Sequence, residues 1–301
     1  MSKPPEKLRP YIFHGVRLHP ESGDENSGDC PFCGKEDKFY VNSITGKWKC
    51  WKCNHVVENT NKPGGNVWGF ITEFHKLCMK TTTAEDYKEL AKDRLLCDFQ
   101  PLIEWQVVKS VLNGNWLVPG TNIKGDITSL YRRCKEKDGH WVLKPTPTLG
   151  HRLFGVNLFD NSKPIVYLCE GPWDALVLWE VLGRVKNVES RLKVTASRES
   201  SLLAQANVVA VPGCETMFDH WLPIFQKKVV NIMFDSDHPR KNSRTNQVLE
   251  GAGIRAVKRL SKMLSSSKHA PQEINYLRWG EEGYDPKRKS GYDVRDFIAK
   301  G

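Results

Sequence analysis

The sequence predicts an α/β protein, α+β overall, with a small N-terminal β module ahead of a mixed α/β core. From residue 165 onward, apolar β-rich runs alternate with runs of helical periodicity, which is typical of a sheet of mainly parallel strands flanked by helices. Between residues 115 and 145, short β-rich runs are separated by glycine-bearing turns, which predicts a small antiparallel sheet. The N-terminal module is indicated by two cysteine pairs that one hairpin can bring together.

Composition is typical of a soluble, packed protein with a polyanionic partner. The chain has 301 residues, 39% of them hydrophobic, and a formal net charge of +10 at pH 7. Such a basic excess favours nucleic-acid binding, although it also serves solubility alone. The N-terminal sequence lacks a targeting pattern, and no run approaches about 18 apolar residues, so we expect a cytoplasmic protein without membrane contact. In that setting, the nine cysteines favour metal binding over disulfides.

The strongest local signal is the spacing C-x2-C-x16-C-x2-C. It is formed by Cys30, Cys33, Cys50 and Cys53. Each pair can direct two thiolates at one ion, and strands predicted at 37–43 and 46–51 return the second pair to the first. We expect one structural zinc ion with all four ligand positions filled, so that the site serves folding and presentation. The alternative is a set of reduced buried thiols or a redox pair.

Basic and aromatic residues are interleaved along this predicted zinc ribbon. The candidates for nucleic-acid contacts are Lys47, Trp48, Lys49 and Trp51. Aromatic rings stack on bases and lysines neutralise phosphates, so the mixture favours a single-stranded nucleic-acid ligand. The alternative for Trp48 is that it belongs to the small core of the ribbon itself.

The sequence divides into four predicted parts. They are a zinc-binding ribbon at 1–56, a linker at 57–66, an N-terminal core subdomain at 67–160 and a second core subdomain at 161–301. Helices are predicted at 67–79, 84–96 and 101–112, the second of them opening with a capping box of Thr83 and Asp86. The antiparallel sheet that follows is basic and carries Arg132, Arg133, Lys144 and Arg152. It is either a groove that holds a nucleic-acid strand or a solvated charged face.

Carboxylates follow the predicted strands of the second subdomain. They are Glu170, Asp174, Asp235, Asp237, Asp293 and Asp296. Because the carboxyl ends of parallel strands meet at one edge, we expect these acids to converge there. Converging carboxylates repel one another unless divalent cations neutralise them, and oxygen ligands favour magnesium or manganese. This predicts metal-dependent phosphoryl transfer; the alternative for Asp174 and Asp296 is an acid favoured at a helix start by its dipole.

These motifs resemble a known family. EGPWDAL, FDSD and YDVRD look like the three acidic motifs of the TOPRIM fold, and with the ribbon upstream they look like those of a DnaG-type or phage DNA primase. The resemblance implies that 161–301 is a TOPRIM subdomain, that Glu170 is a base or metal ligand, and that Asp174 supports it. It implies catalytic roles for Asp235, Asp237 and Asp293, and magnesium or manganese ligation by Glu170, Asp235, Asp237, Asp293 and Asp296. Template or triphosphate would be held by Arg132, Arg133, Lys144 and Arg152.

The implied activity is template-directed synthesis of short RNA primers on single-stranded DNA from ribonucleoside triphosphates. It would use two-metal nucleotidyl transfer, with the ribbon contributing to initiation-site recognition. Alternatives are a TOPRIM-type metal-dependent nuclease and a non-catalytic single-stranded-DNA-binding replication adaptor. The sequence has no G-x-x-x-x-G-K-[ST] motif, so we expect a separate replicative helicase. The compact layout favours a bacteriophage or mobile-element origin over a chromosomal one, and residues 238–251 form an insertion relative to the family pattern.

Overall fold

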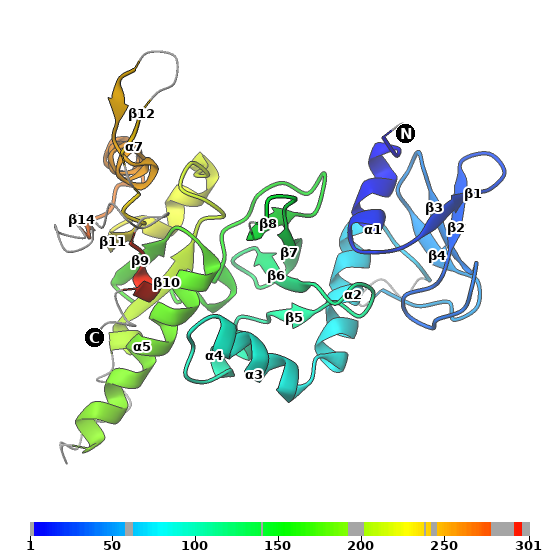
Figure 1. The fold of residues 1–301 in the computed structure, drawn as a ribbon, viewed down its shortest axis with the longest axis horizontal. Helices are drawn as coiled ribbons and strands as arrows, with labels where there is room; N and C mark the ends of the chain where they lie inside the picture. The colour runs from blue at the N-terminus through cyan, green and yellow to red at the C-terminus, as the bar shows by residue number, and fades with distance from the viewer. Residues whose placement is uncertain are drawn as a thin grey trace. The chain divides into compact units, whose positions relative to one another are not determined.

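The structure is a computed structural model that describes residues 3–57, 63–139, 141–191, 202–237, 239–241, 246–277 and 292–296. The chain divides into two compact units (Figure 1). The first consists of Met1–Lys88 and Leu102–Arg152, and the second of Glu89–Pro101 and Leu153–Gly301. The cysteine pairs and the basic sheet therefore belong to one unit, and the acidic motifs to the other.

A four-stranded antiparallel sheet forms the N-terminal part of the first unit. The 3-10 helix η1 (Glu6–Leu8) and α1 (Arg9–Phe13) precede β1 (Leu18–Pro20), β2 (Glu25–Gly28), β3 (Phe39–Asn42) and β4 (Trp48–Cys50), which pair in chain order. The predicted hairpin of β3 and β4 is confirmed. Asn42 Oδ1 holds its turn by accepting hydrogen bonds from the backbone N–H groups of Ile44 and Thr45. The sequence does not predict β1 and β2, because neither carries an alternating apolar pattern.

The described end of the predicted linker pairs with the ribbon. Residues 58–62 lie outside the described part of the chain. Trp48 and Gly65 exchange backbone hydrogen bonds of 2.8 and 3.0 Å, so the chain after residue 62 extends the ribbon edge. A Cβ on Gly64 would lie 2.0 Å from the carbonyl oxygen of Trp48. Glycine at this position therefore allows close backbone packing that any other residue would prevent.

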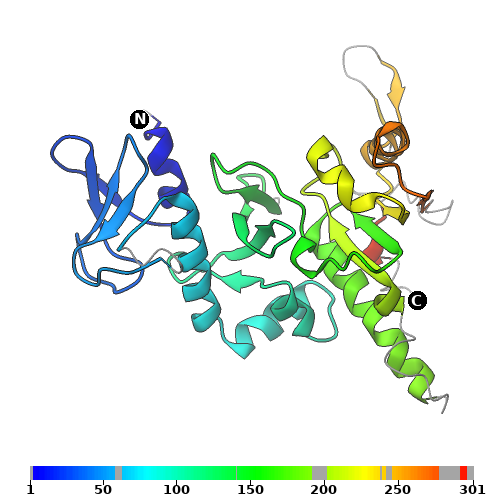
Figure 2. The same cartoon turned by 180° about the vertical axis from the view of Figure 1, so that it is seen from behind.

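Helix α2 (Val67–Thr81) carries the apolar core of the first unit. Asn66 caps it, since its Oδ1 accepts a hydrogen bond from the backbone N–H of Gly69. Phe70 and Phe74 are buried and stack with ring centroids 5.6 Å apart. The same buried cluster contains Phe39 and Trp48 from the ribbon. It also contains Leu117 and Leu130 from the antiparallel sheet between residues 108 and 145, which is described below. Figure 2 shows α2 between these two sheets.

The predictions for the next two helices are confirmed only in part. α3 (Ala84–Asp93) opens with the predicted capping box, in which Thr83 N donates to Asp86 Oδ2 and Asp86 N donates to Thr83 Oγ1. The predicted helix at 101–112 is wrong beyond its first turn, because α4 (Gln100–Glu104) ends and β5 (Val108–Lys109) follows. Gln106 adopts a φ of +56° between them, and the β-branched Val108 is buried in the sheet.

The predicted small antiparallel sheet is confirmed. β5 pairs with β6 (Trp116–Thr121), β6 with β7 (Ile127–Lys135), and β7 with β8 (Trp141–Pro145). Helix α2 packs against β5 and β7. This sheet therefore shares its core with the ribbon.

A parallel sheet forms the centre of the second unit, as the sequence predicts. Its strands are β9 (Ile165–Cys169), β10 (Ala206–Ala210), β11 (Val229–Met233) and β14 (Glu273–Tyr276), in the order β10-β9-β11-β14. Every neighbouring pair is parallel, and Met233 of β11 lies opposite Cys169 of β9. The carboxyl ends of β9 and β11 therefore lie side by side.

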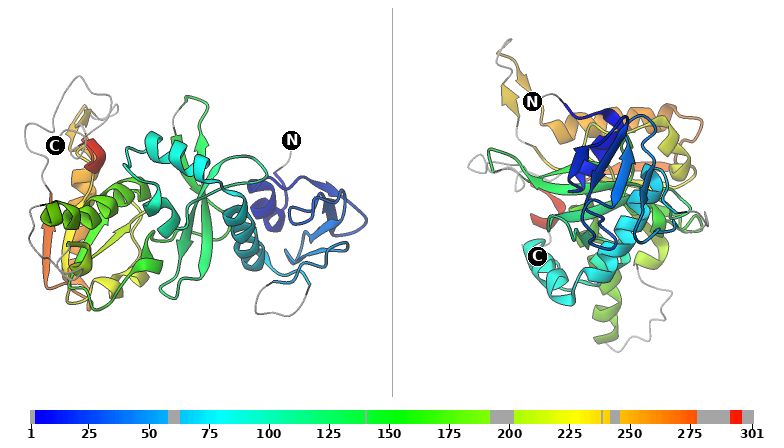
Figure 3. Two further views of the ribbon diagram at one scale, coloured as in Figure 1. Left: turned by 90° about the horizontal axis from the view of Figure 1, so that it is seen from below. Right: turned by 90° about the vertical axis from the view of Figure 1, so that its right-hand side faces the viewer.

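Helices pack on this sheet. α5 (Pro172–Arg191) follows β9 and packs against β9 and β10 (Figure 3). α7 (Ala252–Ser266) contributes Leu260 and Leu264 to a buried cluster with Val230 and Ile232 of β11. Between β10 and β11 the chain forms the 3-10 helix η4 (Asp219–Phe225), which contains Pro223. Among the described helices, none is both long enough and apolar enough to cross a membrane.

The remaining elements are short. They are η2 (Val156–Leu158), α6 (Leu202–Gln205), β12 (Arg240–Lys241) and β13 (Val248–Leu249). β12 and β13 pair antiparallel inside the predicted insertion at 238–251. Of that insertion, residues 238 and 242–245 lie outside the described part of the chain.

Candidate functional site

Four cysteines of the ribbon converge on one point. Cys30 Sγ lies 3.9 Å from Cys53 Sγ, Cys33 Sγ lies 3.9 Å from Cys50 Sγ, and all four sulfur atoms lie within 4.8 Å of one another. Thiolates held at about 2.3 Å from a tetrahedral zinc ion lie roughly 3.8 Å apart, whereas a disulfide needs about 2.05 Å between its sulfur atoms. All four cysteines are free. The cluster therefore fits one structural zinc ion, as the spacing predicts.

A stacked pair beside the cysteines connects the ribbon to α2. Phe32 stacks on His55 with ring centroids 4.2 Å apart and an interplanar angle of 8°. His55 Nε2 lies 3.1 Å from Glu73 Oε2 on α2, and Lys76 Nζ lies 3.0 Å from the other oxygen of the same carboxylate. The sequence does not reveal this contact, because neither spacing nor periodicity relates His55 to Glu73.

Three of the predicted acids lie at the carboxyl edge of the parallel sheet. Glu170 directly follows β9, and Asp235 and Asp237 lie in the loop after β11. Asp235 N donates a hydrogen bond of 3.4 Å to Glu170 Oε2. Asp237 Oδ2 accepts a hydrogen bond of 2.8 Å from Gly253 N in the first turn of α7. The structure thus brings the acids that follow β9 and β11 together, and the start of α7 contacts them.

Two glycines let α7 approach this loop. A Cβ on Gly253 would lie 2.0 Å from the carbonyl oxygen of Asp235, and a Cβ on Gly251 would lie 2.0 Å from that of Asp237. Both distances are far below van der Waals contact, so no side chain fits at either position. The glycines of the sequence EGAG therefore bring the N–H groups of the helix start to the acidic loop.

Burial and mutual repulsion make these acids difficult to ionise. Burial first, and then the charge of Asp237, raise the pKa of Glu170 to about 7. Burial, followed by the charges of Asp174 and Glu170, raises the pKa of Asp235 to about 9. Burial also raises the pKa of Asp174 to about 6, although the positive charge of Arg295 opposes the rise. A bound cation would reverse these shifts by favouring the ionised carboxylates.

One carboxylate oxygen at this edge has no hydrogen-bond or ion-pair partner among the described residues. Asp235 Oδ1 is buried and forms no hydrogen bond within the described part of the chain. Such an oxygen is unfavourable unless a cation or water completes its coordination, and hard oxygen ligands suit magnesium or manganese. Among the described residues, only the four cysteines bring three or more ligand atoms within 4.8 Å of one another. The edge therefore fits a divalent ion held by one or two carboxylates and several waters, which is usual for magnesium.

The other predicted acids have protein partners. Asp174, in the first turn of α5, is buried, and its Oδ1 lies 2.8 Å from Arg295 Nε. Asp293 Oδ2 accepts a hydrogen bond of 2.6 Å from Arg295 Nη2. Asp296 and Asp293 are linked in both directions, since Asp296 N donates to Asp293 Oδ1 and Asp293 N donates to Asp296 Oδ2. Asp174 and Asp293 thus face a guanidinium group, a contact that the sequence does not reveal.

Solved primase structures resemble this chain. The zinc-binding and RNA polymerase domains of the Aquifex aeolicus primase are 16% identical, with 100% of this chain and 83% of that chain covered at a TM-score of 0.44. The primase fragment of the bacteriophage T7 primase-helicase protein is 16% identical, with 91% and 94% covered at a TM-score of 0.42. A DnaG primase catalytic domain bound to single-stranded DNA is 12% identical, with 77% and 74% covered at a TM-score of 0.46.

These structures belong to the family that the sequence motifs resemble. No protein-family model matches the chain, and no curated protein matches it.

The predicted basic residues, three in β7 and β8 and Arg152 after β8, contact neighbouring protein groups. The Arg132 guanidinium lies 4.2 Å from the Phe13 ring centroid, and Arg152 Nε donates a 3.0 Å hydrogen bond to Thr128 Oγ1. Lys144 is exposed, and its Nζ lies 2.6 Å from Glu136 Oε1. Arg133 is buried with its guanidinium 4.1 Å from the Trp141 ring centroid. The prediction that Arg133 grips a ligand is therefore corrected, because burial makes it a structural residue of the sheet.

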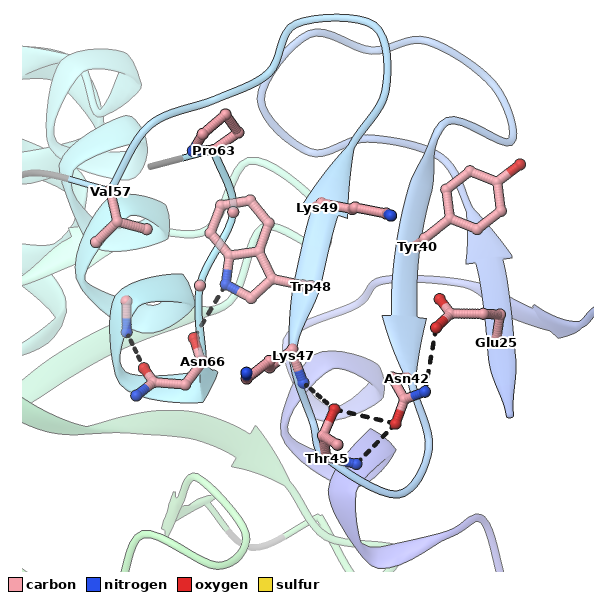
Figure 4. Close-up of a pocket in the computed structure, with 13 residues that line it drawn as sticks. Glu25, Tyr40, Asn42, Thr45, Lys47, Trp48, Lys49, Val57, Pro63 and Asn66 are labelled. Carbon is pink, nitrogen blue, oxygen red and sulfur yellow. Dashed lines mark hydrogen bonds between the residues drawn. The ribbon is translucent and has the colours of Figure 1, made fainter. Parts of the chain in front are cut away.

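A pocket of about 570 Å³ lies on the ribbon beside β3 and β4. Figure 4 shows residues that line it. Tyr40, Lys47 and Lys49 line it. Lys49 Nζ lies 3.7 Å from the ring centroid of Trp51, which is 60% exposed. The pocket thus combines lysine ammonium groups with a phenol, and an exposed indole lies close to Lys49.

Trp48 does not share this exposure. It is 2% exposed, its ring stacks on Phe39 with centroids 5.4 Å apart, and its Nε1 donates a hydrogen bond to the carbonyl oxygen of Asn66. The prediction that Trp48 stacks on a nucleic-acid base is corrected: it is a core residue of the ribbon. Its alternation with the exposed Lys47 and Lys49 follows from the two faces of a strand.

Proposed function

We propose that this protein is a DNA primase that makes short RNA primers on a single-stranded DNA template. The observation that carries the proposal is the meeting of Glu170, Asp235 and Asp237 at the ends of two parallel strands, with Asp235 Oδ1 lacking a described partner. The ribbon supports the proposal, because it pairs a zinc-fitting cysteine cluster with lysine and aromatic side chains. Together these features favour metal-dependent phosphoryl transfer on a nucleic-acid strand.

The proposed chemistry assigns different tasks to the acids. Glu170, Asp235 and Asp237 would hold magnesium or manganese; when bound, two such ions would stabilise charge at the attacking 3′-hydroxyl and the leaving pyrophosphate. Glu170, which directly follows β9 and accepts a hydrogen bond from Asp235 N, would either hold an ion or accept the proton of that hydroxyl. The hydrogen bond from Gly253 N orients the Asp237 carboxylate. Asp293 and Asp296, which hydrogen-bond to each other, lie in the third acidic motif.

The proposed partners follow from the same chemistry. Ribonucleoside triphosphates would be the substrates, and single-stranded DNA would be the template. Lys47, Lys49 and Trp51 on the ribbon would contribute to initiation-site recognition, with stacking on Trp51 and phosphate contacts to the lysines. Lys144, Arg132 and Arg152 would hold template or triphosphate after exchanging their present partners. The replicative helicase would be a separate protein. The primase would act in the cytoplasm, which is that of a bacterial host if a phage encodes it.

A primer-synthesis assay tests the proposal. Zinc-loaded protein, randomised single-stranded DNA, labelled ribonucleotides and magnesium or manganese should yield short template-dependent products. Asp235→Asn keeps the shape of the side chain but weakens metal binding, so product formation should fall roughly 100-fold or more. The matched control is Glu273→Gln, an exposed acid in β14 of the same sheet, and it should retain activity.

Two other results would decide against a primase. Cutting of the template that Asp235→Asn abolishes would identify a metal-dependent nuclease. DNA binding without synthesis or cutting, under both metals, would identify a non-catalytic adaptor.

A further inference from the structure

A guanidinium group lies among the acids of the second unit. Arg295 Nε lies 2.8 Å from Asp174 Oδ1, and Arg295 Nη2 lies 2.6 Å from Asp293 Oδ2. The side chains of Arg295, Asp174 and Asp293 are 28%, 8% and 14% exposed, so these contacts are largely shielded from water. One arginine thus connects the first turn of α5 to the segment 292–296.

These contacts engage two carboxylates that could otherwise hold a divalent ion. Each directs one oxygen to the guanidinium at ion-pair distance, and a metal ion cannot occupy the same position between them. Breaking a buried ion pair leaves an uncompensated charge, which is strongly unfavourable. Asp174 Oδ1 and Arg295 Nε form a 2.8 Å ion pair without hydrogen-bond geometry, whereas Asp235 Oδ1 has neither a hydrogen bond nor an ion pair among the described residues. The acids therefore differ in their direct partners: Asp174 and Asp293 share an internal cation, whereas Asp235 Oδ1 has none among the described residues.

We propose that Arg295 is a built-in cation that takes the place of a divalent ion at Asp174 and Asp293. This inference rests on the proposed function and narrows its metal centre: exchangeable ions bind only on the side of Glu170, Asp235 and Asp237. Arg295 is a positioning residue in this scheme, because it holds two carboxylates and contacts no reacting atom.

A different use of a buried arginine is to bind a substrate phosphate. The guanidinium fork suits a phosphate as well as it suits carboxylates. In this structure, however, both Nε and Nη2 of Arg295 face carboxylates, so a phosphate would have to break two shielded ion pairs. The internal-cation role needs no such exchange.

Manganese binding to the zinc-loaded full chain tests the inference, with electron paramagnetic resonance counting bound ions. Arg295→Gln removes the charge and leaves two unneutralised carboxylates, so this variant should bind one more manganese ion per chain than the unmodified protein. Arg295→Lys keeps the charge and should bind the same number as the unmodified protein. An Arg295→Gln variant with an unchanged ion count overturns the inference.

A second variant keeps the test decisive if Arg295→Gln fails to fold. Asp293→Asn leaves Arg295 in place, and it should not change the number of bound manganese ions, because Asp293 holds none. Loss of an ion in this variant also overturns the inference. The proposed function is judged separately: Asp235→Asn should lose bound manganese, and an unchanged count there refutes the proposed metal centre whatever the Arg295 variants show.

Discussion

At the scale of single residues, burial and partners decide what each side chain can do. Trp48 and Trp51 are three positions apart, yet the first is a core residue and the second is exposed. Asp174 and Asp235 both lie in the acidic region, yet Asp174 forms an ion pair with Arg295, whereas no ion pair or hydrogen bond of Asp235 Oδ1 is present among the described residues. Residue type alone therefore does not separate a ligand from a structural residue.

The raised carboxylate pKa values predict a stability that depends on pH. Folding raises the pKa of Asp235 from 3.8 to about 9 and that of Glu170 from 4.5 to about 7, so the folded state binds more protons than the unfolded state between these values. The stability they contribute is complete below about pH 4 and is lost as pH rises through about 7 and then 9. Without added magnesium, these two groups should make the melting temperature decrease as the pH rises from about 5 to about 9.

Thermal unfolding with and without magnesium checks this prediction. Magnesium should raise the melting temperature most at the alkaline end, where the carboxylates are ionised and the ion compensates their repulsion. Asp235→Asn removes the group with the largest shift and should flatten the pH dependence. A melting temperature that rises steadily from pH 5 to 9 in the unmodified protein would contradict the assignment of these buried acids.

Gly253 is predicted to tolerate no side chain. A Cβ there would lie 2.0 Å from the carbonyl oxygen of Asp235, so Gly253→Ala should destabilise the protein by about 1–3 kcal/mol and displace the loop that carries the acids. Gly183→Ala, inside α5, is the matched control, because a Cβ on Gly183 would lie 3.4 Å from the Leu203 side chain, which is ordinary contact. This substitution should be neutral or stabilise the protein by up to about 1 kcal/mol. Urea unfolding measures both. Equal effects of the two substitutions would argue against the tight contact at Gly253.

At the scale of helices and strands, the sequence predicts the elements whose pattern is local. The parallel strands β9 and β11 have continuous apolar runs, and the capping box of Thr83 and Asp86 marks the start of α3. The 101–112 prediction is wrong because the apolar spacing after Glu104 suits either a helix or a buried strand, and pairing of β5 with β6 decides between them. Strands β1 and β2 owe their conformation to pairing rather than to an apolar pattern.

In the candidate site too, local sequence patterns predict some residues, while others are determined only by contacts in the folded unit. Glu170, Asp235 and Asp237 could be identified because each follows an apolar run that predicts a strand, and strand ends of parallel sheets meet. The pairing of Arg295 with Asp174 could not be predicted, since the two residues belong to segments whose contact arises only in the folded unit. The stacking of Phe32 on His55 is hidden for the same reason.

Helix α2 allows a test of one local signal. Asn66 Oδ1 accepts the hydrogen bond from Gly69 N at the helix start, so Asn66→Ala should lower the free energy of unfolding by about 1 kcal/mol. Asn66→Asp keeps an acceptor and should retain most of the stability. Chemical denaturation of the zinc-loaded protein compares the three. If alanine and aspartate destabilise equally, the cap does not contribute as assigned.

At the scale of the whole molecule, the two candidate centres belong to different compact units. The cysteine cluster shares a buried core with α2 and the antiparallel sheet, through residues that include Phe39, Phe70 and Leu117. The acids belong to the unit of the parallel sheet, which has its own core around Val166, Ile232 and Leu260. Damage to the ribbon should therefore affect the first unit more than the acidic edge.

This separation predicts which step of primer synthesis needs zinc. Cys50→Ser removes one of the four ligands and should release the ion, and because a closed zinc site contributes directly to folding, the ribbon should lose its order. Primer initiation on a template should then fall roughly tenfold more than extension of a supplied primer, since the acids proposed to catalyse both steps belong to the other unit. Cys97→Ser, at an exposed free cysteine outside the cluster, is the matched control and should keep both zinc and initiation. Zinc content, initiation and extension are measured on the same preparations, and an equal loss of both activities in Cys50→Ser would refute the division of labour between the two units.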